Sequence, residues 1–418
     1  MARNHTLYFT APSAALALVI SGCGIGEEDS FDVWIMQGTN PDATAYFEDI
    51  ADQFEEETGV EANIEFQDWA DAHDQFVTAM AGDTAPDVAE VGTTWTPEFA
   101  AAGGLVDITD QVGDTDRFVD ALAEAGELDG RMYGMPWYAG VRSVVYRTDV
   151  FEELDLEEPG NWDELREVAT TIADERDDMA AFPVAGGATQ QMLPFIWGNG
   201  GELATEEDGT WSSGLASAEA REGIEFYTNL DLEDGTSTAG AATWDEADLQ
   251  DNFIDGNVAM MISGSWTPSA ILEGNPDLEG DIGAFPIPGR DGGISPAFLG
   301  GSHLAVMDGA DEEAAGSFIE LLTEEENLRR WAEESTYFPG VQEQLDPYTE
   351  SDDPLVRPFA EQMSEGGATV PVSENWGKVE GDETLTTMLQ SVLDERATVD
   401  EATEEAATAV DETLNEGS

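Results

Sequence analysis

Residues 31 to 91 indicate the class of fold most clearly: FDVWIMQGTNPDATAYFEDIADQFEEETGVEANIEFQDWADAHDQFVTAMAGDTAPDVAEV. This stretch contains three short runs of strand-forming residues, Phe31–Met36, Val60–Phe66 and Pro86–Val91. The two longer segments between these runs carry apolar residues at helical spacing. Strands that alternate with helices pair into a parallel sheet covered by helices on both faces. We therefore predict an α/β fold whose ligand-binding loops follow the carboxyl ends of the strands.

The first part of the chain has the features of a secretory signal. A basic start and the apolar stretch Leu7–Ile20 precede the string ISGC, and the stretch is shorter than the roughly 20 apolar residues of a membrane-spanning helix. The string resembles the lipobox of bacterial lipoproteins, which implies an acylated cysteine. We expect a lipoprotein signal peptide at residues 1–22 and a tether at residues 23–30, with Cys23 anchoring the chain at the extracellular face of the cell membrane. An ordinary cleaved signal followed by an unmodified cysteine is the alternative.

The net charge of the chain is extremely negative. Asp and Glu number 91 against 14 Lys and Arg, which gives a formal net charge of −77. Such a chain repels nucleic acids and anionic membrane surfaces. The acidic residues are dispersed along the whole chain, so we interpret them as a solvation device for a salty, halophilic environment and not as a cation-binding site. The hydrophobic fraction of 41% with 11 Trp is sufficient for folded cores and argues against disorder.

The chain beyond the tether is too long for one hydrophobic core. About 390 residues favour two lobes. The pattern beyond residue 91 predicts a cleft-edge loop at Gly134–Gly140, a strand at Ser143–Tyr146, a helix at Trp162–Ile172 capped by Asn161, a binding loop and helix start within 182–201, an exposed excursion at 204–215, a strand at Val258–Ile262, and a helical tail from Glu383 to Leu414.

Several stretches, taken in order along the chain, resemble the bacterial family 1 extracellular solute-binding proteins, which include maltose-binding proteins and oligosaccharide-binding lipoproteins of actinobacteria. They are APDVAEVGTTW (85–95), DGRMYGMPWYAGVRSVVYRTDVFEE (129–153), WDEL (162–165), FIDGNVAMMISGSW (253–266), GAFPIPG (283–289), FLGGSHLAV (298–306), TYFPGV (336–341) and TVDEATEEA (398–406). The ordered set is more specific than any single stretch. It implies a two-lobed periplasmic-binding-protein-like fold of type II, which binds a sugar between its lobes and delivers it to the permease of an ABC importer.

The resemblance also implies how the chain is divided. The N-terminal lobe is expected to comprise residues 31–140 and 290–337, and the C-terminal lobe residues 144–282 and 342–418. Crossings between the lobes are expected near Ala139–Ser143, Ile282–Pro288 and Tyr337–Val341.

Sugar rings have apolar faces and hydroxyl edges, so a sugar site needs aromatic platforms bordered by hydrogen-bonding groups. Trp266, which follows a Gly-Ser turn, matches a family position that stacks on a sugar ring. The other aromatic candidates are Trp69, Trp95, Trp137, Tyr138, Trp197 and Trp376. Trp162, Trp244 and Trp331 lie in helical or turn contexts, where we expect them to pack in the interior.

Polar candidates border these aromatic residues in the sequence. We favour Gln37, Asp68, Gln190 and Gln191, with Thr94, Arg142 and Asn375 as weaker candidates. Gly300, Gly301 and Ser302 are expected to form a close turn that presents backbone N–H groups to the ligand, and His303 after them is expected to be a hydrogen-bonded structural residue.

The loop after the third predicted strand bears on the kind of sugar. Maltose-type relatives place an acidic residue there, whereas this chain has Gly92-Thr93-Thr94. We therefore expect an uncharged sugar of two or three units, for which an N-acetylated one such as chitobiose is a candidate.

Three other classes of protein stay open. A binder of polyamines or other cations in the same fold would need acidic side chains among the cleft aromatics, where Asp68 is a candidate. A glycoside-active enzyme would need a carboxylate pair, which 91 acidic residues could supply by chance, but we find no nucleophile or metal-binding motif. A structural cell-wall protein would leave the cleft loops unexplained. We predict a monomeric binding protein without cofactor, metal or catalytic activity, whose partners are the oligosaccharide and the permease.

Overall fold

A computed structural model of the chain describes residues 31–37, 42–82 and 84–416. The predicted signal peptide, the acylated Cys23 and the tether lie outside the described residues. Within the described part, no helix is both long enough and apolar enough to cross a membrane.

The first elements of the fold alternate as the sequence predicts. They are β1 (Phe31–Gln37), α1 (Thr44–Thr58), β2 (Ala62–Asp68), α2 (Trp69–Ala81) and β3 (Val88–Gly92). β1 pairs in parallel with both β2 and β3, so the carboxyl ends of the three strands point the same way. α1 ends at Gly59, whose left-handed conformation (φ 77°) lets its N–H donate to the carbonyl of Glu55. The predicted α/β alternation of residues 31–91 is confirmed.

Beyond β3, the chain continues with helices of 4 to 16 residues, some of them consecutive, and with further strands. The helices are α3 (Thr96–Ala101), α4 (Thr109–Val112), α5 (Asp120–Ala125), α6 (Thr148–Leu154), α7 (Trp162–Glu175), α8 (Leu193–Trp197), α9 (Ala218–Leu232), α10 (Glu246–Ile254), α11 (Thr267–Gly274), α12 (Glu312–Thr323), α13 (Glu325–Ser335), α14 (Asp346–Thr349), α15 (Arg357–Gly366), α16 (Trp376–Gly381), α17 (Thr384–Leu393) and α18 (Val399–Leu414). The strands are β4 (Glu127–Leu128), β5 (Arg131–Met132), β6 (Met135–Arg147), β7 (Ala204–Glu207), β8 (Thr210–Ser213), β9 (Met260–Gly264), β10 (Ile282–Phe285), β11 (Ala297–Val306), β12 (Phe338–Pro339) and β13 (Gly367–Ala368).

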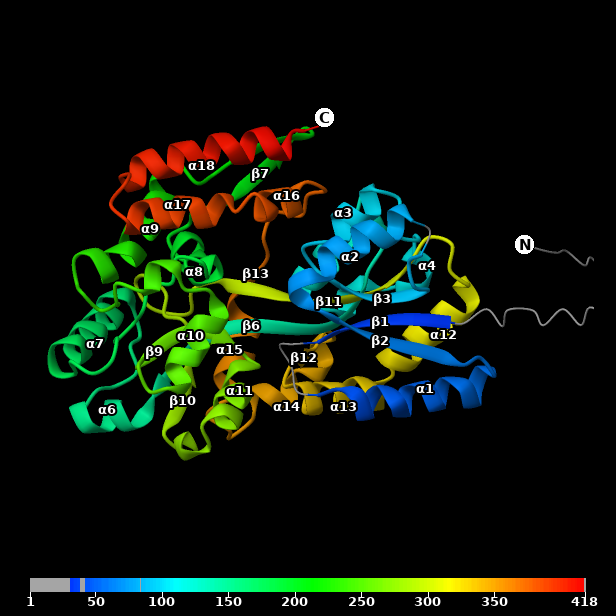
Figure 1. Ribbon diagram of the computed structural model, residues 1–418, viewed down its shortest axis with the longest axis horizontal. Coiled ribbons are helices and arrows are strands. Elements are labelled where there is room, and N and C mark those ends of the chain that lie inside the picture. Colours follow the sequence, from blue (N-terminus) through cyan, green and yellow to red (C-terminus); the bar gives the residue numbers. More distant parts are fainter. Residues whose placement is uncertain (1–30, 38–41, 83, 417–418) are drawn as a thin grey trace, which may run out of the picture. The chain divides into compact units, whose positions relative to one another are not determined.

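Two long strands join the parts of the main sheet (Figure 1). β6 pairs with β11 along its first part and with β9 and β10 along its second part. β11 also pairs with β3, which gives the strand order β10-β6-β11-β3-β1-β2. The predicted loop at Gly134–Gly140 and the predicted turn at Gly300–Ser302 are therefore wrong, because residues 135–140 and 300–302 lie within these strands. Glycine is needed at Gly301, where a Cβ would lie 2.2 Å from the carbonyl oxygen of Tyr138.

The buried side chains form separate clusters that these strands connect. One cluster, which includes Tyr138 and Leu304, is the N-terminal core, and another, which includes Ala139 and Leu299, is the C-terminal core. β6 therefore crosses from the first to the second at residues 138–139, and β11 crosses back at residues 299–304. A crossing thus lies in β11 and not in the predicted segment Ile282–Pro288, which belongs to the C-terminal side. The fold is α/β and two-lobed, as predicted, while the exact residue boundaries of the lobes stay a prediction.

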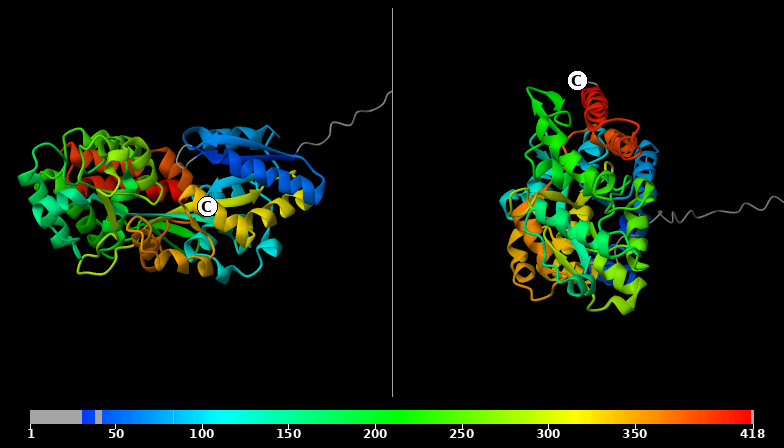
Figure 2. Two further views of the ribbon diagram at one scale, coloured as in Figure 1. Left: turned by 90° about the horizontal axis from the view of Figure 1, so that it is seen from below. Right: turned by 90° about the vertical axis from the view of Figure 1, so that its left-hand side faces the viewer.

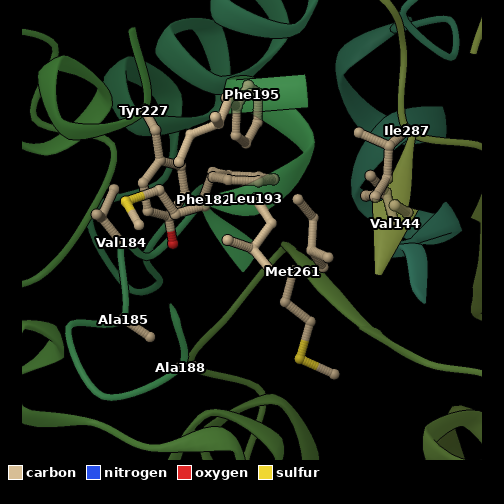
Figure 3. Close-up of a cluster of buried hydrophobic side chains, with 14 of the residues drawn as sticks. Val144, Phe182, Val184, Ala185, Ala188, Leu193, Phe195, Tyr227, Met261 and Ile287 are labelled. Carbon is tan, nitrogen blue, oxygen red and sulfur yellow. The ribbon is translucent and has the colours of Figure 1, made fainter. Parts of the chain in front are cut away.

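The C-terminal lobe has a large aromatic and aliphatic core, part of which Figure 3 shows. Phe195 of α8 stacks on Tyr227 of α9 with ring centroids 5.2 Å apart, and Phe182 lies in the same cluster. The predicted cap of α7 is confirmed, since the side chain of Asn161 accepts a hydrogen bond from the N–H of Glu164 at 2.9 Å.

The C-terminal tail is helical, as predicted, and forms α17 and α18. The predicted excursion at 204–215 is mostly the hairpin of β7 and β8, which lies beside α18 (Figure 2, right, green and red). Hydrogen bonds between Trp211 and Asn415, at 2.9 Å and 3.0 Å, attach the hairpin to the end of the helix.

Candidate functional site

A cavity of about 500 Å³ lies where β3, β6 and β11 run side by side, within the usual size range of ligand pockets. Paired residues of these strands form the floor of the cavity. Ser302 is paired with both Tyr138 and Gly92, and Gly300 is paired with Gly140. Alternate residues of a strand point to the same face, so these positions share the cavity side of the sheet.

Glycines in β3, β6 and the neighbouring strand β9 make room for indole rings directly over the strand backbone. A Cβ at Gly140 would lie 2.6 Å from the ring of Trp266, and one at Gly264 would lie 2.3 Å from it. A Cβ at Gly92 would lie 3.2 Å from the ring of Trp69. The glycines in these strands therefore set the depth at which the aromatic residues lie.

Aromatic side chains from both lobes surround the floor. Trp69 and Trp95 lie at one side, with ring centroids 5.4 Å apart, and both rings are partly exposed. Trp266 lies at the other side, 5.4 Å from the ring of Tyr337, which stacks on Tyr138 at 4.3 Å. The cavity thus offers partly exposed indole faces from two directions.

An ion pair forms one polar part of the wall. The guanidinium of Arg142 in β6 donates to both carboxylate oxygens of Glu246 in α10, at 2.8–3.1 Å. The Arg142 side chain is only 6% exposed, whereas that of Glu246 is 40% exposed. Bidentate pairs of this kind fix the orientation of both groups.

A second polar wall comes from α16 and the start of α17. The carboxylate of Glu380 accepts a hydrogen bond from the indole N–H of Trp376 at 3.1 Å and one from the hydroxyl of Thr94, which follows β3. Glu380 is exposed where it lines the cavity, and partial desolvation by the surrounding protein raises its pKa. The Thr94 contact joins the segment after β3 to α16, and α16 also approaches α3, since a Cβ on Gly377 would lie 2.2 Å from Glu98.

A buried carboxyl group lies in the strand that forms one side of the floor. Glu90 of β3 is 1% exposed, and it accepts hydrogen bonds from the Ser302 hydroxyl at 2.7 Å, the Met36 N–H at 2.8 Å and the Tyr138 hydroxyl. Burial raises the pKa of Glu90 to about 7, although the three hydrogen bonds oppose this shift. The signal for it in the sequence is an acidic residue inside the apolar run VAEV.

The structure brings many of the predicted residues together around the cavity. Those that line it are Trp69, Thr94, Trp95, Tyr138, Gln190, Trp266, Gly300, Gly301, Ser302 and Trp376, together with the weaker candidate Arg142. Trp376 is 1% exposed, so its ring is enclosed where it borders the cavity.

Five predicted residues lie elsewhere. Trp137 is completely buried and stacks on Trp331 at 5.0 Å, because it points to the opposite face of β6 from Tyr138. Gln191 is also buried, with its Oε1 3.5 Å from the hydroxyl of Tyr227. Trp197 borders a separate hollow beside Arg290.

Gln37 and Asp68 end β1 and β2 opposite each other and are exposed, outside the cavity lining. Asn375, a weaker candidate, donates to backbone carbonyls at the end of α18.

The predictions of structural roles are largely confirmed. His303 is buried, with its ring nitrogens 2.8 Å from the Thr96 hydroxyl and 2.9 Å from the Leu122 carbonyl. Trp162 and Trp331 are buried in the two cores, and Trp244 is partly buried against the C-terminal one.

Several lining residues were missed by the sequence analysis. They include Glu246, Phe298, Tyr337, Glu380 and Glu383. Glu246, Glu380 and Glu383 are indistinguishable in the sequence from other acidic residues, whereas Phe298 and Tyr337 belong to the quoted stretches FLGGSHLAV and TYFPGV. Among the described residues, no group of three or more His, Cys, Asp or Glu is placed to bind a metal ion.

Two α/β lobes joined by crossing strands, with a cavity lined from both sides, define a solute-binding protein. The chain belongs to the family of bacterial extracellular solute-binding proteins, whose model matches residues 38–328. The resemblance found in the sequence is thereby confirmed.

Individual relatives extend the match over nearly the whole chain. The diacetylchitobiose binding protein DasA of Streptomyces coelicolor is 27% identical over 412 residues, which cover 93% of this chain and 94% of DasA. The maltotriose-binding protein of Pyrococcus abyssi is 24% identical over 380 residues, 86% of this chain and 77% of that protein. Among solved structures, an ABC transporter solute-binding protein of Thermotoga lettingae bound with α-D-tagatose superposes with a TM-score of 0.80 at 25% identity, covering 92% of this chain and all of that one.

Proposed function

We propose that this protein captures a short, uncharged oligosaccharide of two or three units and delivers it to the permease of an ABC importer. The observation that carries the proposal is the set of partly exposed indole rings, Trp69, Trp95 and Trp266, around a cavity of about 500 Å³ with polar edges. Apolar ring faces bind indoles, and the hydroxyl edges of the same sugar bind the bordering polar groups.

The charges at the cavity favour a ligand without negative charge. Arg142 is the one basic residue among the described lining residues, and its guanidinium is already bound by Glu246. Glu380 and Glu383 add further acidic groups to the lining. An anionic sugar would therefore meet repulsion without a free cation to bind it.

An N-acetylated disaccharide such as diacetylchitobiose is the specific ligand that we propose. The name of the relative DasA supports it, as does the uncharged segment Gly92–Thr94 beside the cavity. We also propose that the protein is a monomer attached to the extracellular face of the cell membrane through Cys23.

Titration calorimetry in about 2 M KCl, which screens the surface charge, tests the proposal against its rivals. The panel is N,N′-diacetylchitobiose, maltose, spermidine and calcium chloride. We expect one-to-one binding of diacetylchitobiose, and recovery of the sugar intact after incubation. Binding of maltose alone would correct the choice of sugar, binding of spermidine alone would establish the cation binder, and cleavage of the sugar would establish an enzyme.

A further inference from the structure

The guanidinium of Arg142 lies against two of the aromatic rings that line the cavity, those of Trp266 and Phe298. Its central carbon is 5.6 Å from the ring centroid of Trp266 and 5.2 Å from that of Phe298. Both distances are within the range of cation–π contacts, and both rings line the cavity and are partly exposed. Arg142 is thus in contact with two rings that a ligand would meet in the cavity.

The guanidinium is itself fixed from a third element. Glu246, the first residue of α10, accepts three hydrogen bonds from it at 2.8–3.1 Å. α10 is in turn held at its start by the capping box of Asp245 and Asp248. The planar fork of arginine is therefore held by Glu246 at the place where it contacts both rings.

Within the described residues, no hydrogen bond fixes the ring plane of Trp266, but neighbouring groups contact the ring. The backbone at Gly140 and Gly264 lies under the ring, and Tyr337 lies 5.4 Å away. Arg142 adds a charged plane that contacts Trp266 and Phe298 at once.

We propose that Arg142, oriented by Glu246, is a positioning residue that fixes the ring planes of Trp266 and Phe298 before the ligand enters. The proposal rests on the proposed function, because the rings are presented to a sugar. A ring already held in its binding orientation loses less conformational entropy when the ligand binds, so the affinity is higher.

Arg142→Met tests the proposal, since methionine retains an apolar stem but removes the guanidinium. We expect this variant to bind N,N′-diacetylchitobiose about tenfold more weakly than wild type in calorimetry. Arg147→Met is the matched control: Arg147 lies on the same strand, donates to both oxygens of Asp149 at 2.6–2.7 Å, and lies outside the cavity lining. It should bind as wild type does, and equal losses in both variants would overturn the proposal.

A charge exchange separates positioning from mere ion pairing. The double variant R142E/E246R keeps the possibility of an ion pair but removes the guanidinium from β6, where it contacts both rings. We expect its affinity to stay about tenfold below wild type. Recovery of wild-type affinity would show that only the pair matters and would overturn the proposal.

A measurement without ligand makes the test independent of the proposed function. In protein labelled with 5-fluorotryptophan, the ¹⁹F resonance of Trp266 is assigned by its loss in Trp266→Phe. It should shift or broaden in Arg142→Met and stay in place in Arg147→Met. An unmoved resonance overturns the positioning role, whereas wild-type protein that binds no sugar overturns only the proposed function.

Arg142→Lys serves if the methionine variant does not fold, because lysine keeps the charge and loses the bidentate fork. We expect a shifted Trp266 resonance and an affinity loss of a few-fold. Wild-type values for both would overturn the proposal.

Discussion

The buried carboxyl group of Glu90 makes a stability prediction whose sign and size follow from the structure. Its pKa is raised from 4.5 to about 7 by burial in the folded protein, while the unfolded chain keeps the ordinary value. Between these two values the folded protein holds a proton that the unfolded chain has lost, so the free energy of unfolding decreases as the pH rises. At about 1.4 kcal/mol per pKa unit, the decrease is on the order of 3 kcal/mol, complete above about pH 7.

Glu90→Gln removes the titration and keeps the shape of the side chain. Its amide can accept from the N–H of Met36 and donate towards the oxygens of Ser302 and Tyr138, so the buried polar groups keep partners. The wild-type free energy of unfolding, measured relative to that of the variant, should therefore fall by about 3 kcal/mol between about pH 4.5 and 7 and then stay level.

Urea unfolding followed by tryptophan fluorescence, in about 2 M KCl at a series of pH values, measures this difference, and subtraction removes the contributions of the other acidic residues. Glu158→Gln is the control, because Glu158 also accepts from a tyrosine hydroxyl, that of Tyr146 at 2.8 Å, but is exposed. It should show little pH-dependent difference from wild type. If the stabilities of wild type and Glu90→Gln changed in parallel with pH, the prediction would be wrong, because Glu90 would then titrate alike in the folded and unfolded states.

Further predictions concern the ligand, the charge and the anchor. Trp266→Ala should weaken binding of diacetylchitobiose by about 5- to 150-fold, a ring contact worth on the order of 1–3 kcal/mol, and unaltered affinity in calorimetry would contradict its role. Trp137→Ala should instead lower the free energy of unfolding by about 3–5 kcal/mol in urea and leave affinity nearly unchanged. The melting temperature should rise between about 0.1 M and 2 M KCl as repulsion is screened, and an unchanged value would remove the halophilic interpretation. Cys23→Ala should release the protein into the medium with its affinity intact; retention in the membrane fraction would count against acylation.

The sequence predicted those features of the fold that depend on local periodicity. The alternation in residues 31–91 specified three parallel strands and two helices, since a side-chain repeat of two or of about 3.6 residues is set by neighbours along the chain. The family was predicted from the ordered stretches that resemble it, and the two lobes were predicted from that resemblance. The glycines of β6 and β11 were misinterpreted as loop residues because glycine often marks turns; in this sheet several of them make room for indole rings or for the neighbouring strand.

Part of the candidate site was equally predictable. Trp266, Trp95 and Trp69 follow strands whose ends meet at one place, so their position along the chain was enough to bring them to the cavity. A strand's alternation also places Trp137 and Tyr138 on opposite faces, but it does not say which face is the core. That was decided by Trp331, which lies 194 positions further along the chain and stacks on Trp137.

The polar part of the site was decided by the tertiary structure alone. Glu246 and Glu380 are 2 of 91 acidic residues, and nothing near them in the sequence distinguishes them from the solvated ones. They acquire their roles by packing: Glu246 because α10 faces the guanidinium of Arg142, and Glu380 because α16 meets Thr94 of the other lobe. Local pattern was enough to predict the alternating strands and helices of residues 31–91 and to bring Trp69, Trp95 and Trp266 to the cavity. Which charges pair and which are buried depends on the dielectric surroundings and on partners distant in the chain, and these exist only once the chain has folded.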